Sequence, residues 1–400
     1  MKVIEKKTLL PFCLVTSLFL LWGLANNMTD TLLSAFKKIM SMTDTQTSFI
    51  QFAFYGAYFV IALPAALFIR KHSYKSGVIL GLCLYAGGAI LFMPAAKAAS
   101  YGFYLVAIYI MASGCSVLET TANPYIMSMG TPETATRRLN IAQAFNPIGS
   151  IIGILMSKFF ILKDISLYSV SGTYMTLGLV LVVIMIVMAC ANMPEGRDSG
   201  SQDSVAATFR RLFHNKVYAW GVVAQFFYVG AQIGVWSFTI RLAMQELGIV
   251  EASAATIYLI SIICHCSGRF IYTWLMKWFA PSKLLAFNAV AALLCTAGVV
   301  VFRGMGWLPV ICVVLISFFM CIMFPTIYGL ALCNIENPEK GGHAGDTKIG
   351  ASGLIMAILG GALLTPVQAM VSDATSINIS YLVPLVCFVI IFFYARMAKE

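Results

Sequence analysis

The 400-residue sequence contains few charged side chains. Asp, Glu, Lys and Arg together make up 10% of it, whereas 60% of the residues are hydrophobic. Roughly 25% of the residues of a typical soluble protein are charged, so this scarcity excludes a soluble protein. The same composition excludes a disordered chain, a coiled coil, collagen and a small disulfide scaffold. We therefore expect a protein whose solvent is lipid.

Residue clusters typical of catalysis or metal binding are also missing. The four histidines lie far apart, at positions 72, 214, 265 and 343, and the eleven cysteines form no CxxC pair. Cys264 and Cys266 would point about 200° apart on a helix, so they cannot share a metal ion. No Walker loop is present to bind a nucleotide. The sequence thus predicts no enzyme activity, no catalytic residue, no metal and no other cofactor.

Long apolar runs dominate the chain instead. A helix needs about 20 mostly apolar residues to cross a bilayer, and twelve such runs cover residues 10–36, 47–69, 76–95, 101–127, 138–162, 171–191, 217–247, 252–279, 282–302, 308–335, 346–372 and 378–397. Lys and Arg are roughly three times as frequent in the segments on the N-terminal side of the membrane as on the opposite side, which marks the N-terminal side as cytoplasmic. The sequence predicts an all-α membrane protein of twelve transmembrane helices with both termini in the cytoplasm.

One polar stretch divides these runs into two sets of six. Residues 192–216 are rich in Gly, Ser, Asp and basic residues, as in a linker, and we expect an interfacial helix around Phe209–Phe213. NPYIMSMG and FNPIGSIIG in the first set are echoed by FPTIYGLAL and ILGGALLTP in the second. Such parallel repeats predict a six-helix bundle over 1–191, a cytoplasmic linker over 192–216 and a six-helix bundle over 217–400.

Two acidic residues lie deep inside apolar runs. Glu119 is in the middle of the fourth run, and Asp30 lies past the middle of the first. A charge near the bilayer centre costs at least about 2.5–3.5 kcal/mol, so acids at this depth are functional candidates. Burial disfavours the charged form of a carboxylate and lets it exchange a proton near neutral pH. We therefore expect Glu119 and Asp30 to exchange protons.

Amide and aromatic side chains accompany the two acids. Asn27 is three residues from Asp30 and therefore shares its helix face. Carboxylates and amides can bond pairs of hydroxyl groups, while aromatic rings can cover the apolar face of a pyranose, so these residue types are typical of a sugar site. The expected sugar-binding residues are Asp30, Asn27, Gln143, Asn146, Trp22, Gln232 and Trp236.

Helical spacing supports part of this set. Asn140, Gln143 and Asn146 recur at i, i+3 and i+6, and the seventh run repeats polar or aromatic residues every three or four positions, at Gln225, Tyr228, Gln232 and Trp236. The alternative for these residues is packing, with amides joining neighbouring helices. For the aromatic residues of the second run we expect packing: Phe52, Phe54, Tyr55, Tyr58 and Phe59.

Several long strings in the sequence are specific. They include PFCLVTSLFLLWGLANNMTDTLL, LETTANP, RLNIAQAFNPIGSIIG, QFFYVGAQIGVWSFTIRLA and ILGGALLTPVQAMVSDA. On these strings the chain resembles the fucose:proton symporter family of the major facilitator superfamily, nearly from end to end. The resemblance implies the major facilitator fold of two six-helix bundles and import of L-fucose with a proton by alternating access.

The resemblance also implies roles for individual residues. Glu119 occupies the place of the family's proton-transferring glutamate, and Asp30 that of an aspartate linked to sugar binding and coupling. Asn27, Gln143 and Asn146 match polar positions of the family. Phe324 departs from the pattern, because a hydroxyl-bearing Tyr at that place would contact a sugar more strongly.

The sequence leaves other substrates open. Another hexose, such as glucose, galactose, fructose or N-acetylglucosamine, fits the same residues, whereas a multidrug exporter of the same fold would favour a less polar interior. The expected partners are a small sugar, a proton and the lipid bilayer, with no nucleic acid, and we expect a functional monomer. The expected location is a bacterial inner (plasma) membrane, which the chain crosses many times.

Overall fold

The computed structural model describes residues 3–4, 6–39, 44–156, 166–196, 204–336 and 343–398, and for residues 6, 25, 26, 29–38, 44–49, 51 and 344 it describes the backbone alone. Within these ranges the chain forms helices and no strand, which confirms the all-α prediction. Eleven helices there are long and apolar enough to cross a membrane. The expected first span coincides with α1 (Leu9–Ile39), whose Leu9–Leu24 part is a further apolar stretch.

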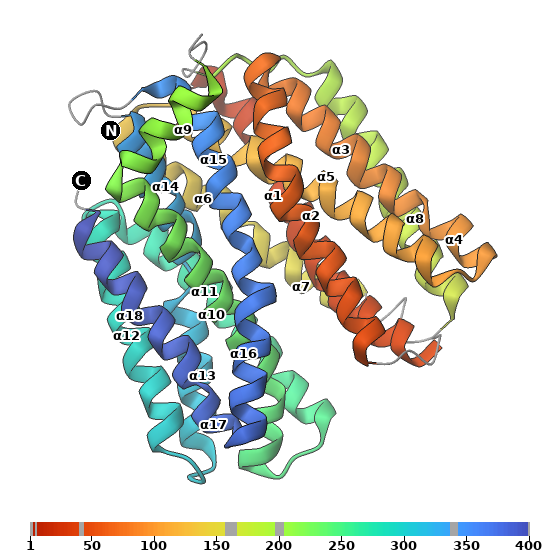
Figure 1. The fold of residues 1–400 in the computed structure, drawn as a ribbon, viewed down its shortest axis with the longest axis vertical. Coiled ribbons are helices and arrows are strands. Elements are labelled where there is room, and N and C mark those ends of the chain that lie inside the picture. Colours follow the sequence, from red (N-terminus) through yellow and green to blue (C-terminus); the bar gives the residue numbers. More distant parts are fainter. Residues whose placement is uncertain are drawn as a thin grey trace. The chain divides into compact units, whose positions relative to one another are not determined.

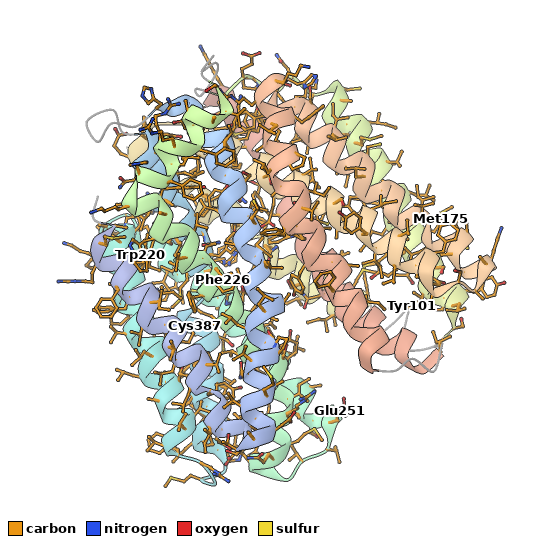
Figure 2. All side chains as sticks on the ribbon, viewed as in Figure 1. Tyr101, Met175, Trp220, Phe226, Glu251 and Cys387 are labelled. Atoms are coloured by element: carbon orange, nitrogen blue, oxygen red, sulfur yellow. The ribbon has the colours of Figure 1, made fainter. Side chains whose placement is uncertain are left out.

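Large apolar side chains point away from the helices over much of the surface (Figure 2). Trp220, labelled there, exposes 52% of its surface, and Leu294 and Val301 expose 64% and 69%. Extensive exposed apolar surface of this kind marks contact with a membrane or a partner. Together with the span lengths, it fits a protein surrounded by lipid.

The chain folds into two units, and unit 1 comprises Met1–Pro132, Ile148–Gln202 and Ala344–Met356. Besides α1, its helices are α2 (Asp44–Lys71), α3 (Tyr74–Ile90), α4 (Phe92–Ala98), α5 (Tyr101–Ser128), most of α7 (Asn146–Met156), α8 (Leu167–Cys190) and α15 (Thr347–Met356). Within the unit, α3 packs along α5 and α8, and α15 packs on α2 and α5 (Figure 1).

Glycines bring α3 and α5 into backbone contact at the centre of unit 1. A Cβ atom at Gly88 would overlap the backbone nitrogen of Met111, and one at Gly114 would overlap that of Tyr85. Such close approach is a common use of small residues between membrane helices. Every residue of α5 from Met111 to Met127 is buried, including the acidic residue in the middle of this stretch.

Unit 2 comprises Glu133–Pro147, Asp203–His343 and Ala357–Glu400. Its helices are α6 (Ala135–Gln143), α9 (Val205–His214), α10 (Lys216–Leu247), α11 (Glu251–Leu275), α12 (Pro281–Val301), α13 (Trp307–Phe319), α14 (Met323–Glu336), α16 (Gly360–Ala374), α17 (Ile377–Ser380) and α18 (Leu382–Met397). Here α10 packs on α16 and α18, α12 packs on α18 and α13, and α6 packs on α14 (Figure 1). Short 3-10 turns lie at Lys6–Thr8, Pro132–Thr134, Ala344–Asp346 and Ala357–Leu359.

The expected linker contains one helix. The helix anticipated around Phe209–Phe213 is α9, in which Thr208 and Leu212 are buried while Phe213 is 76% exposed. This one-sided burial is typical of a helix that lies along a surface. Residues 197–203 are outside the described ranges, so the bundle limits 1–191 and 217–400 stay a prediction.

Several of the expected continuous spans contain a break, and two of these breaks lie beside candidate site residues. The described part of the run at 138–162 contains α6 and α7, and the run at 308–335 contains α13 and α14. Each second segment carries a proline in its first turn, Pro147 in α7 and Pro325 in α14. Proline has no backbone N–H and clashes with the carbonyl four residues earlier, so it ends the preceding segment. Hydropathy taken over about 20 residues does not register such a break, because it covers both segments together.

Candidate functional site

The polar centre of unit 1 is Glu119 on α5, which is 2% exposed. Both of its carboxyl oxygens are buried and accept no hydrogen bond from the described residues. Asn123, one turn later, donates from Nδ2 to the backbone oxygen of Glu119 at 3.0 Å. This amide therefore bonds the helix backbone and not the carboxyl group. A charged carboxylate here would have no donor among the described residues to compensate for its lost hydration. The neutral acid is the form that these surroundings accommodate.

An aromatic pair joins α1 and α2, and one of its members, Tyr58, interacts with Glu119. Trp22 on α1 donates from Nε1 to the Tyr58 hydroxyl of α2 at 2.5 Å, and Ser116 Oγ donates to the backbone oxygen of Tyr58 at 3.4 Å. Tyr58 is buried and interacts electrostatically with Glu119. The sequence singled out Trp22 but assigned Tyr58 to packing, because the spacing of five aromatic residues does not show which one meets a partner from α1.

Two other candidates of the first span lie in α1. Asn27 is half-buried, and its Nδ2 donates to the backbone oxygen of Gly23 at 3.2 Å. Asp30 lies in the same helix, but its side chain is outside the described residues. Its roles in proton exchange and sugar binding therefore stay predictions.

In unit 2 the expected stripe of amides does not lie on one helix. Gln143 is the last residue of α6 and is 1% exposed, whereas Asn146 is the first residue of α7 and is half-buried. Asn140 is buried and donates from Nδ2 to the backbone oxygen of Thr136 at 2.9 Å and to Thr326 Oγ1 at 3.3 Å. Asn140 thus joins α6 to α14, as in the packing alternative.

The second expected set in unit 2 is on α10. Gln232 and Trp236 are half-buried, and Trp236 donates from Nε1 to Ser317 Oγ at 3.3 Å. The Trp236 ring meets the ring of His265 edge to face, with centroids 5.2 Å apart. His265 Nδ1 lies 3.0 Å from the backbone oxygen of Ser317. Gln232 and Trp236 therefore keep part of their amide and indole groups accessible to a small polar molecule.

The remaining α10 candidates and Phe324 are buried. Gln225 is fully buried, and its two amide atoms have no partner among the described residues. Tyr228 donates to the backbone oxygen of Met320 at 3.2 Å, and its ring lies 6.2 Å from that of Phe324. Phe324 is 6% exposed and packs against this aromatic neighbour.

Sequence reasoning missed two buried ionisable residues of α11. His265 and Arg269 are 1% and 3% exposed. A charged or titratable residue inside an apolar run is a signal in itself, and Arg269 could have been singled out on that basis. What it contacts depends on two other spans, which the sequence does not place.

The chain matches the model of the Major Facilitator Superfamily over residues 14–345. It is 39% identical to an L-fucose-proton symporter of Haemophilus influenzae, with 99% of this chain and 98% of that protein aligned. It is 38% identical to an L-fucose-proton symporter of Escherichia coli, over 99% of this chain and 94% of that protein.

Among solved structures, the crystal structure of the Major Facilitator Superfamily transporter FucP in the outward conformation superimposes with a TM-score of 0.90. The two chains are 36% identical, and the match covers 99% of this chain and all of the other. This match confirms the predicted fold. The chain belongs to the Major Facilitator Superfamily and, within it, to the family of the L-fucose-proton symporters.

Proposed function

We propose that the protein is a secondary active transporter that imports L-fucose together with a proton by alternating access. The observation that carries this proposal is the similarity to two L-fucose-proton symporters over nearly the whole chain. Glu119, a buried acid without a hydrogen-bonding partner for its carboxyl group among the described residues, supplies a group that can exchange a proton.

Proton coupling in this proposal rests on the acids of unit 1. Glu119 takes up a proton on the outer side, which removes a buried charge and lowers the free energy of the loaded state. The Tyr58 hydroxyl, which interacts with this acid, is held by a hydrogen bond from Trp22. Asp30 takes part in the same proton exchange and also accepts hydrogen bonds from the sugar.

Sugar binding rests on amides and aromatic rings. Asn27, Gln143, Asn146 and Gln232 pair with hydroxyl groups, and the rings of Trp22 and Trp236 cover the apolar face of the pyranose. Site residues that hydrogen-bond a hydroxyl discriminate strongly, because a sugar without that hydroxyl leaves them unpaired. The sugar preference therefore follows from which hydroxyl groups the amides meet.

The proposal places the protein in a bacterial inner membrane as a functional monomer surrounded by lipid, with both termini in the cytoplasm. The unequal distribution of Lys and Arg between the two sides supports this orientation. The polypeptide itself performs no catalysis in this scheme, because the sugar leaves the protein chemically unchanged.

Uptake of labelled L-fucose into proteoliposomes tests the proposed function. We expect accumulation that requires an inward proton gradient and that unlabelled L-fucose competes better than glucose, galactose, fructose or N-acetylglucosamine. Empty liposomes and a proton uncoupler are the controls. Accumulation competed best by another hexose would reject L-fucose as the substrate, and the absence of any sugar uptake by folded protein would reject sugar symport.

Replacing Asp30 tests its proposed double role. Asp30→Ala removes an acceptor of sugar hydrogen bonds, and a hydrogen bond to a charged group contributes about 1.5–3 kcal/mol. We therefore expect L-fucose binding to weaken roughly tenfold to a hundredfold and accumulation to stop. Asp373→Asn, at an exposed position near the end of α16, is the matched control. Unchanged sugar affinity in Asp30→Ala would exclude the binding role.

A further inference from the structure

Arg269 is a buried cation for which the proposed transport cycle has no use. It lies on α11 in unit 2 and is 3% exposed. Its guanidinium donates from Nε to the backbone oxygen of Cys321 at 2.8 Å and from Nη1 to the backbone oxygen of Gln143 at 2.6 Å. In the described part of the chain no carboxylate is paired with it. The partners of this charge are two carbonyl groups.

Both carbonyl groups have lost their helical donor to a proline. In an α-helix each carbonyl accepts from the N–H four residues later. For Gln143 that residue is Pro147, and for Cys321 it is Pro325. Proline has no N–H, so neither carbonyl can accept the hydrogen bond that an uninterrupted helix would supply. The guanidinium of Arg269 replaces both missing donors at once.

The position of these carbonyls also explains how the charge is tolerated. Gln143 is the last residue of α6, and Cys321 follows the end of α13 at Phe319. The C-terminal end of a helix carries partial negative charge from its unpaired carbonyls and stabilises a nearby cation. With no water in the hydrocarbon region, such carbonyls must find a donor within the protein.

We propose that Arg269 is a positioning residue for sugar binding, because it caps the carbonyl groups left by Pro147 and Pro325 and thereby fixes the residues beside these two breaks. At the first break these are Gln143 and Asn146, two of the proposed sugar-binding residues. At the second break it is Phe324, the residue before Pro325. The expected effect on sugar affinity rests on the proposed function, whereas the capping of the two carbonyl groups does not.

A double-mutant cycle tests the capping. Arg269→Gln is combined with Pro147→Ala or with Pro325→Ala, because each alanine restores the N–H that the orphaned carbonyl lacks. We expect Arg269→Gln to lower the thermal unfolding midpoint of the purified protein, and each alanine to recover part of the loss. Pro366→Ala, within α16, is the matched control and should recover nothing, because Arg269 does not contact the carbonyl that Pro366 leaves free. Strictly additive effects at both Pro147 and Pro325 would overturn the capping role.

L-fucose affinity separates positioning from a purely structural role. We expect the folded fraction of Arg269→Gln to bind L-fucose roughly tenfold more weakly, corresponding to the loss of one or two net hydrogen bonds, with partial recovery in the Pro147→Ala double variant. A lowered thermal unfolding midpoint with an unchanged affinity for L-fucose would overturn the positioning role of Arg269. If Arg269→Gln does not fold, Arg269→Lys replaces it in the cycle, since it keeps the charge but offers a single nitrogen.

The two proposals fail in distinguishable ways. If the unmodified protein binds no sugar, the proposed function and the positioning role are rejected together. The thermal unfolding midpoints of the double-mutant cycle still show whether Arg269 caps the two carbonyl groups. If the unmodified protein binds L-fucose and both double variants are additive in midpoint and affinity, only the inference on Arg269 is rejected.

Discussion

Glu119→Gln is expected to abolish proton-driven accumulation of L-fucose while leaving sugar exchange across the membrane. Glutamine has nearly the shape of a protonated glutamate but cannot take up or release a proton. The two carboxyl oxygens of Glu119 have no partner among the described residues, so the amide breaks no hydrogen bond. The substitution should therefore fix this position in its neutral state without disturbing the packing of α5.

The size of the effect follows from the energy of one proton. A charge that crosses about 100 mV releases about 2.3 kcal/mol, which corresponds to roughly 50-fold accumulation if one proton enters with each sugar. With Glu119→Gln we expect the internal and external concentrations of labelled L-fucose to become equal under the same potential. Counterflow in liposomes preloaded with unlabelled L-fucose should continue.

Glu251→Gln is the matched control for this experiment. Glu251 lies in the first turn of α11 at an exposed position (Figure 2), so the same chemical change occurs in water. We expect this variant to accumulate L-fucose as the unmodified protein does. Accumulation by Glu119→Gln at that level would show that another group carries the proton.

The sequence predicted the spans and the buried acid because both depend on the transfer of side chains from water to lipid. A run of about 20 apolar residues is favourable in lipid wherever its neighbours lie, and an acid within it is unusual in any arrangement. Glu119 was found in this way, and the structure places it at 2% exposure. Its proton role was predicted too, and it awaits the experiment above.

Details that depend on pairs of distant residues were not accessible in this way. Asn140 contacts Thr326, 186 positions later, and Arg269 reaches two carbonyls in two other spans. Hydropathy and helical spacing describe one helix at a time, so they cannot tell an amide that joins helices from one that is free for a ligand. Tyr58 was expected to pack and is buried, but its hydrogen bond with Trp22 was not predicted for the same reason, since Trp22 comes from another helix.

Gly149→Ala is expected to have the largest effect on folding. Gly149 lies in α7 against α1, where a Cβ atom would overlap the backbone oxygen of Leu20 and lie 3.0 Å from the backbone nitrogen of Leu24. Backbone atoms cannot move aside as a side chain would, so the two helices must separate. We expect a loss of more than about 3 kcal/mol in unfolding free energy, the upper range for overpacking.

Gly87→Ala provides the comparison for this prediction. Gly87 lies within α3, and nothing is within 4 Å of the position that its Cβ would occupy. The same methyl group should therefore change the stability by no more than about 1 kcal/mol. Purified yield, size-exclusion profile and thermal unfolding midpoint measure both variants, and equal values for the two would contradict the close contact of α7 with α1.

The position of Gly149 also links folding to sugar binding. At Gly153, one turn later, an added Cβ atom would lie 2.7 Å from the backbone oxygen of Leu24, and Ser150 donates from Oγ to the backbone oxygen of Gly23 at 3.4 Å. These contacts hold the part of α1 that carries Trp22, one of the proposed sugar-binding residues. A fraction of Gly149→Ala that does fold should therefore bind L-fucose more weakly, whereas Gly87→Ala should retain the affinity of the unmodified protein.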